Sequence, residues 1–339
     1  MAAPSTTEKN KKPGLASRLT GRWQQYLQRT PHRSFRLTRR RDYARDFQLP
    51  GYWKFTGEVW QVLIKDKKLF LGVVVVYALL SILAVGMISQ QAYDELNFYL
   101  NDVGQEITGG DVGGFTKALV VFGVTLMGDL NSGALSEAQQ IYSALLSLLC
   151  WLTMVWLLRQ RLAGHAVKLR DGLYSSGAPI VPSLLITLVI IVQLLPVALG
   201  FIGLQVAQSS GIGESGVEAM MLWLAVILLG VLSLYWVTSS LVAMVLVTIP
   251  GMYPFAALKE AGQLVLGRRL RLMLRLLWLL AMIVCFWALL LIPIILIDRL
   301  LGISWLPLVP VSVVVVGAFT IVWSATYIYL LYRRLIDAE

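Results

Sequence analysis

Few residues in this chain have the types and spacing that catalysis or metal binding requires. The two histidines, His32 and His165, lack cysteine or carboxylate partners at metal-ligand spacing. The two cysteines, Cys150 and Cys285, both lie inside apolar runs, where they are expected to act as small hydrophobic residues. We therefore predict no catalytic residue, no metal site and no cofactor, and we expect the protein not to be an enzyme.

Two glycine-rich stretches share only their composition with catalytic motifs. Residues 211–216 include a serine, but not at the G-x-S-x-G spacing of a nucleophile elbow. Residues 109–114 lack the lysine and the spacing of a P-loop. We therefore interpret both stretches as loops. An enzymatic site would instead require the acids Asp94, Asp102 and Asp129 to converge.

Arginine is the residue type with the most specific chemistry here. Residues 18–45 contain nine arginines and no lysine, interleaved with aromatic residues. Guanidinium groups bind phosphates in a bidentate manner, and basic residues beside a first span attract anionic lipid. We therefore take Arg39, Arg40 and Arg41 as candidate contacts for anionic lipid of the inner leaflet. A protein partner at this segment is the alternative, and nucleic acid is not expected.

A second group of arginines follows a helical pattern further along the chain. We expect one amphipathic helix over Leu258–Arg275, lying along the inner headgroups or docking a partner. Four arginines in this region are candidate contacts for lipid or a partner: Arg268, Arg269, Arg271 and Arg275.

The composition places most of the chain in lipid. Hydrophobic residues make up 57% of the chain and charged residues 14%, whereas a soluble domain has about 25% charged residues. A bilayer core needs roughly 20 apolar residues per helix. We therefore predict an all-α protein with a cytoplasmic, partly disordered Arg-rich head over residues 1–51 and a membrane domain over residues 52–339. The predicted spans are 69–90, 138–158, 181–207, 219–249, 273–297 and 307–332.

Charge asymmetry predicts the orientation. Residues 1–68 hold 16 of the 29 lysines and arginines. The loops at 159–170 and 259–275 and the tail hold most of the others, which by the positive-inside rule places all of these segments in the cytoplasm. Both termini are then cytoplasmic, and we expect a bacterial inner membrane. A seventh span at residues 115–130 would invert the later loops, so we predict a re-entrant or interfacial helix there.

The polar content of the spans bears on transport. Away from their ends they contain no Asp, Glu, Lys, Arg or His, which disfavours an ion-coupled carrier. A polar path through Gln193, Ser233 and Ser239 remains possible for a passive solute or lipid. Our leading hypothesis is a structural or accessory protein that organises lipid or a partner through basic amphipathic helices, with a small-solute or lipid transporter as the alternative.

The chain also shows a weak internal repeat, in which an amphipathic cytoplasmic helix precedes a membrane hairpin three times. The middle copy begins near His165. At a constant offset of 202 residues, Glu58, Gln61 and Lys67 correspond to Glu260, Gln263 and Arg269.

One of these copies resembles a known element. The segment PFAALKE at residues 254–260, followed by LVLGRR at 264–269, resembles a helix that leads into a hydrophobic hairpin in certain bacterial six-helix proteins. These are the YciC-like and DUF975-like proteins and the membrane domain attached to some glycerophosphoryl diester phosphodiesterases. Gly262 occupies a position where those proteins often have serine. The resemblance implies a helical membrane module and carries over no catalytic residue.

Overall fold

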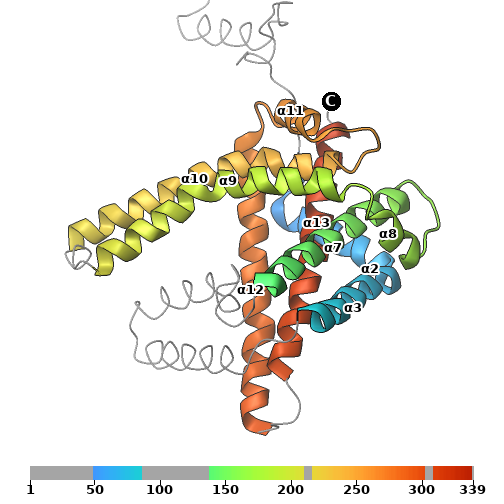
Figure 1. Ribbon diagram of the computed structural model, residues 1–339, viewed down its shortest axis with the longest axis horizontal. Helices are drawn as coiled ribbons and strands as arrows, with labels where there is room; N and C mark the ends of the chain where they lie inside the picture. Colours follow the sequence, from blue (N-terminus) through green and yellow to red (C-terminus); the bar gives the residue numbers. More distant parts are fainter. Residues whose placement is uncertain (1–48, 86–136, 210–215, 302–307, 338–339) are drawn as a thin grey trace, which may run out of the picture.

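The computed structural model describes residues 49–85, 137–209, 216–301 and 308–337. Within these ranges every regular element is an α-helix, so the predicted all-α class is confirmed. The described helices are α2 (Tyr52–Lys65), α3 (Lys67–Ala84), α7 (Glu137–Leu162), α8 (Leu169–Ser175), α9 (Ile180–Ser209), α10 (Gly216–Leu246), α11 (Pro254–Leu264), α12 (Arg269–Leu301) and α13 (Leu308–Asp337) (Figure 1).

Six of these helices, α3, α7, α9, α10, α12 and α13, are long and apolar enough to cross a bilayer. Each of them overlaps one predicted span. α3 ends at Ala84, before residue 90, and α10 ends at Leu246, before residue 249. α9 and α13 have 30 residues each. Such helices are about 45 Å long and exceed a hydrocarbon core of about 30 Å. The six helices make the chain a multi-pass membrane protein. The re-entrant or interfacial helix predicted at residues 115–130 lies outside the described residues.

The helices follow the order of the repeat expected from the sequence. A short helix precedes two long helices three times within the described residues. We call α2, α3 and α7 the first unit, α8, α9 and α10 the second unit, and α11, α12 and α13 the third unit.

Seven buried positions of the first unit correspond to buried positions of the third unit. Phe55, Val59 and Leu63 form the buried face of α2. The same offset of 202 residues that relates Glu58 to Glu260 leads from these three residues to others that are also buried. The buried pairs are Phe55 and Ala257, Val59 and Ala261, Leu63 and Val265, Phe70 and Leu272, Val73 and Arg275, Val74 and Leu276, and Tyr77 and Leu279.

The second unit repeats part of this pattern with smaller side chains. Gly172 and Ser176 are buried 113 residues after Val59 and Leu63. A Cβ atom at Gly172 would lie 2.8 Å from two carbons of the Leu157 side chain. Only glycine therefore allows α8 to lie this close to α7.

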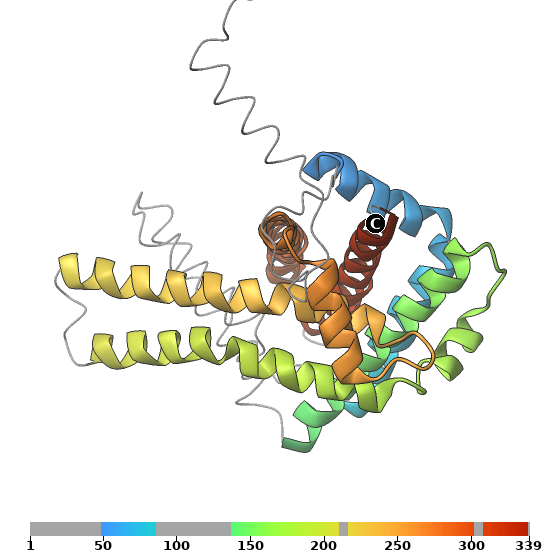
Figure 2. The same cartoon turned by 90° about the horizontal axis from the view of Figure 1, so that it is seen from above.

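The three hairpins do not run parallel. Figure 1 shows α12 and α13 side by side, with α9 and α10 crossing their direction at a steep angle, and Figure 2 shows α12 and α13 nearly end-on. α13 is central, because it packs against α2, α3, α7, α10 and α12. The α9–α10 hairpin is joined to this core mainly by one end. In the most apolar stretches of α9 and α10, only 6% and 12% of the residues are buried.

The core lies where the hairpins converge. Many of its buried side chains come from residues 152–158 of α7, from residues 242–247 at and just beyond the end of α10, and from residues 322–335 of α13. We call this the basic end, because it holds five arginines at or near helix ends: Arg159, Arg161, Arg268, Arg275 and Arg333. Leucines farther along the hairpins, such as Leu199 and Leu289, are exposed, as lipid-facing side chains would be.

The expected single helix over Leu258–Arg275 is divided in the structure. α11 ends at Leu264, and α12 begins at Arg269. Gly267 between them has φ of 75°, a left-handed conformation that ends helices and that glycine adopts without strain. The predicted continuity of the helix was therefore wrong. The expected polar face of arginines was also wrong in this region, because Arg268 and Arg275 are buried while Leu270 is 62% exposed.

Candidate functional site

Polar contacts join the first unit to the second and join helices within the first unit. The Arg159 guanidinium on α7 donates a hydrogen bond to the carbonyl oxygen of Thr248, just beyond α10, at 2.8 Å. On the same helix, Arg161 forms an ion pair with Asp66, which lies at the bend between α2 and α3. Inside the first hairpin, the hydroxyl groups of Tyr77 and Thr153 share a hydrogen bond of 2.7 Å. These contacts hold the ends of the helices in register.

A second set of contacts attaches α2 to the third unit. The Arg275 guanidinium donates a hydrogen bond to the Pro50 carbonyl oxygen, and it lies 4.5 Å from the ring centroid of Tyr52 and 5.3 Å from that of Phe55. Further along α2, Glu58 forms an ion pair with Arg334 of α13 at 3.0 Å. The N-terminal turn of α2 is therefore held by a buried arginine.

The candidate lipid-contacting arginines lie in different environments. Arg268 and Arg275 are buried, with 3% and 4% of their surface exposed. Arg269 is half-buried, and its guanidinium carbon lies 5.3 Å from the Tyr235 ring centroid. Arg271 is exposed. Lipid contact therefore stays a prediction, and of these four arginines Arg271 is the most accessible to a headgroup. The candidates Arg39, Arg40 and Arg41 lie outside the described residues.

The candidate polar path lies within the α9–α10 hairpin. The Ser240 hydroxyl donates a hydrogen bond to Gln193 Oε1 at 2.8 Å, and the Val197 backbone N–H donates one to the Ser233 hydroxyl at 3.3 Å. Ser239 donates a hydrogen bond to a carbonyl of its own helix at 3.1 Å. These groups are used in helix packing, which is a frequent role of small polar residues in membranes. Transport through them stays a prediction.

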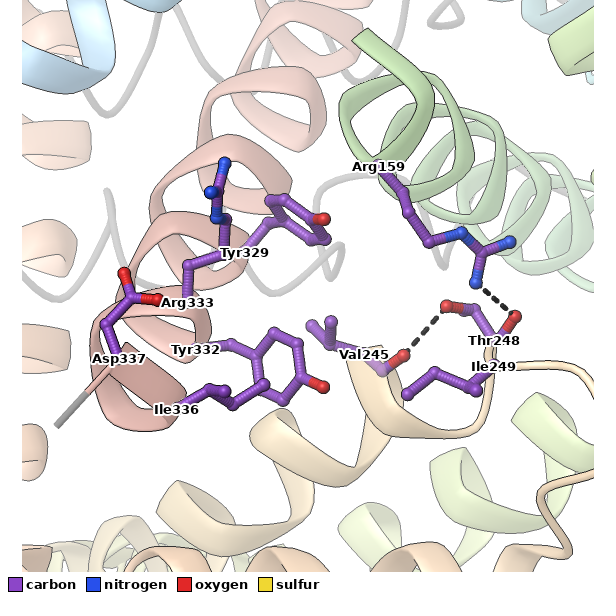
Figure 3. Close-up of a pocket in the computed structure, with 9 residues that line it drawn as sticks. All are labelled: Arg159, Val245, Thr248, Ile249, Tyr329, Tyr332, Arg333, Ile336 and Asp337. Atoms are coloured by element: carbon purple, nitrogen blue, oxygen red, sulfur yellow. Dashed lines mark hydrogen bonds between the residues drawn. The ribbon is translucent and has the colours of Figure 1, made fainter. Parts of the chain in front are cut away.

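A cavity of about 260 Å³ lies at the basic end, where the second long helices of all three units meet (Figure 3). α7, the end of α10 with the turn after it, and α13 each contribute to its wall. The lining residues are Arg159, Val245, Thr248, Ile249, Tyr329, Tyr332, Arg333, Ile336 and Asp337.

The polar groups of this cavity are mostly donors. Figure 3 shows the hydroxyl groups of Tyr329 and Tyr332 directed from α13 toward the side occupied by Arg159. Two facing acceptors already have partners, because the Thr248 carbonyl accepts from Arg159 and the Val245 carbonyl accepts from the Thr248 hydroxyl at 2.8 Å. The Asp337 carboxylate is a further acceptor in the lining. The arrangement suits a ligand that accepts hydrogen bonds.

A second cavity of about 450 Å³ lies between α2 and α13. Arg333 and Asp337 line both cavities, so the two lie on either side of the last turns of α13. The Glu58–Arg334 ion pair belongs to the wall of the second cavity. Its lining carries three basic and two acidic side chains but no tyrosine hydroxyl, and we assign it no ligand.

Each short helix also exposes an aromatic side chain beside a basic one. Trp53 on α2, Tyr174 on α8 and Phe255 on α11 are 70%, 91% and 81% exposed. Trp53 and Phe255 occupy equivalent positions of the repeat, 202 residues apart. The exposed basic neighbours are Lys54, Arg170 and Lys259. Exposed aromatic and cationic side chains together are typical of helices in the headgroup region.

Sequence reasoning did not identify the cavity. Arg159 and Arg333 were used only as topological signals, and Tyr329 and Tyr332 were not singled out. A signal was nevertheless present, because Tyr329, Tyr332 and Arg333 follow helical spacing at the end of the last span. Their convergence with Arg159 depends on packing between units.

Among the described residues, no group of three or more His, Cys, Asp or Glu side chains could hold a metal ion. No family model, curated protein or solved structure matches the chain. The resemblance to YciC-like and DUF975-like membrane proteins therefore stays a prediction.

Proposed function

We propose that this chain is a non-enzymatic accessory protein of the bacterial cytoplasmic membrane that gathers anionic lipid around its basic end. In this proposal the basic end and both termini face the cytoplasm. The observation that carries it is the threefold occurrence of an exposed aromatic residue beside an exposed basic residue, on α2, α8 and α11.

The aromatic and basic side chains contribute different parts of the interaction. Aromatic rings of Trp53, Tyr174 and Phe255 favour the boundary between headgroups and acyl chains. Each lysine or arginine near an anionic surface adds about 1 kcal/mol of attraction. Three such groups are enough to enrich anionic lipid locally without a deep binding pocket.

The experiment measures which lipids remain with the protein. The full chain is reconstituted in vesicles of equal parts phosphatidylglycerol and phosphatidylcholine, extracted in mild detergent and analysed by lipid mass spectrometry. We expect phosphatidylglycerol to be enriched, and the enrichment to fall in the triple variant Lys54→Gln, Arg170→Gln, Lys259→Gln.

A variant with three changes away from the short helices serves as the control. Leu199→Ala, Leu228→Ala and Leu289→Ala alter exposed side chains along the hairpins, and enrichment should persist there. Equal amounts of both lipids around the wild-type protein would contradict the proposed function.

A further inference from the structure

We propose that the cavity between α7, α10 and α13 binds a phosphoryl oxyanion, presented by an anionic lipid headgroup or by a free phosphate compound. This inference rests on the proposed function and names a specific site within it. The cavity is built by all three units, so a ligand there would contact each of them.

Hydrogen-bond donors that face the cavity carry the first part of the argument. A guanidinium has five N–H donors, and the one hydrogen bond from Arg159 to Thr248 leaves others available. The hydroxyl groups of Tyr329 and Tyr332 point toward the same side, as Figure 3 shows. An ionised phosphodiester offers only acceptors, and it therefore complements these three side chains.

The charges around the cavity carry the second part. Arg159 and Arg333 contribute two positive charges and Asp337 one negative charge. Across α13, Arg334 is paired with Glu58. The C-terminal ends of α7, α10 and α13 oppose an anion, but helix-end dipoles act weakly at a surface and within the last turn. Hydrogen bonds between guanidinium and phosphate are charge-assisted and stronger, so an anion is favoured.

The shape of the cavity restricts the ligand. A volume of about 260 Å³ is just below the range of drug-sized sites, which begins at about 300 Å³. It accommodates a headgroup or a small phosphate compound. Val245, Ile249 and Ile336 supply an apolar wall beside the donors, which suits the start of the acyl chains of a lipid.

The experiment measures binding to the full chain purified in a non-ionic detergent. The probes are dioctanoyl phosphatidylglycerol, dioctanoylglycerol without phosphate, and sodium phosphate. We expect phosphatidylglycerol to bind and dioctanoylglycerol not to bind. Binding of sodium phosphate with similar affinity would identify a free phosphate compound as the ligand; its absence would identify the lipid headgroup. Both results support the site.

Variants locate the binding. The double variant Tyr329→Phe, Tyr332→Phe should weaken binding about tenfold or more, since hydrogen bonds to a charged group are lost. Arg333→Gln should also weaken binding, because one of the two positive charges at the cavity is lost. Arg159→Gln should do the same, but it also removes the bond to Thr248, so the other two variants decide the outcome if it fails to fold. Lys68→Gln, at an exposed lysine near the start of α3 and outside the cavity, is the charge-matched control and should bind within twofold of wild type.

Three results would overturn the inference. If all cavity variants bind phosphatidylglycerol as wild type does, or if Lys68→Gln loses as much affinity as they do, binding is diffuse. The site is then wrong while the proposed function survives. If the wild-type protein binds none of the probes, the site is also wrong; if it in addition shows no phosphatidylglycerol enrichment in vesicles, both proposals fail.

Discussion

Arg159 on α7 donates a hydrogen bond of 2.8 Å to the carbonyl oxygen of Thr248, and the two residues belong to different units of the repeat. The accepting carbonyl lies just beyond the end of α10, where helix carbonyls lack intrahelical partners. A charged donor of the first unit therefore gives a hydrogen-bond partner to a carbonyl oxygen of the second unit.

We predict that Arg159→Gln lowers the free energy of unfolding by about 1–3 kcal/mol, because a hydrogen bond from a charged donor is lost and a carbonyl is left without it. Thermal unfolding of the purified protein in detergent measures the change. Arg170→Gln should stay within about 0.5 kcal/mol of wild type, as expected for an exposed position. Equal stability of both variants would show that the contact between units contributes nothing.

Gly172 tests the close approach of α8 to α7. Gly172→Ala should cost about 1–3 kcal/mol of stability, since the added methyl group overpacks against the buried Leu157. Gly57→Ala is the matched control, because nothing lies within 4 Å of a Cβ at that helical position. It should be neutral or gain about 0.5–1 kcal/mol. A Gly172→Ala protein as stable as the Gly57→Ala protein would refute this packing.

Arg275 of α12 and Arg334 of α13 allow a comparison between a buried and an exposed arginine that each contact the α2 segment. Arg275→Gln removes a hydrogen bond to the Pro50 carbonyl and contacts with two aromatic rings. It should lower the free energy of unfolding by about 2–3 kcal/mol. Arg334→Gln breaks only the half-exposed pair with Glu58 and should cost less than about 1 kcal/mol. Protease sensitivity of the segment before α2 provides the measurement. A greater effect at Arg334 would mean that α2 is held at its middle and not at its start.

Hydropathy predicted the helices well, because a lipid-facing helix needs about 20 apolar residues whatever its neighbours are. The repeat was also visible in the sequence through Glu58 and Glu260. The structure gives a reason for it, because residues 202 positions apart, such as Val59 and Ala261, are both buried. Side chains that enter the core must recur at the same spacing when the same short helix and hairpin are built again.

Three features could not be predicted, and each depends on tertiary contacts. The turn at Gly267 looked like one glycine within an amphipathic pattern. The burial of Arg275 requires the Pro50 carbonyl and two aromatic rings from α2, which are over 200 residues away in the sequence. The cavity requires α7, α10 and α13 to meet at one end, and no local pattern encodes that meeting.

The orientation of the basic end tests the central claim most directly. In a chain with Cys150 and Cys285 replaced by alanine, single cysteines are introduced by Tyr174→Cys and Phe255→Cys, at side chains that are 91% and 81% exposed. A membrane-impermeant maleimide is then applied to intact bacterial cells and to lysed cells. The account predicts labelling only after lysis; labelling of either cysteine in intact cells would contradict it.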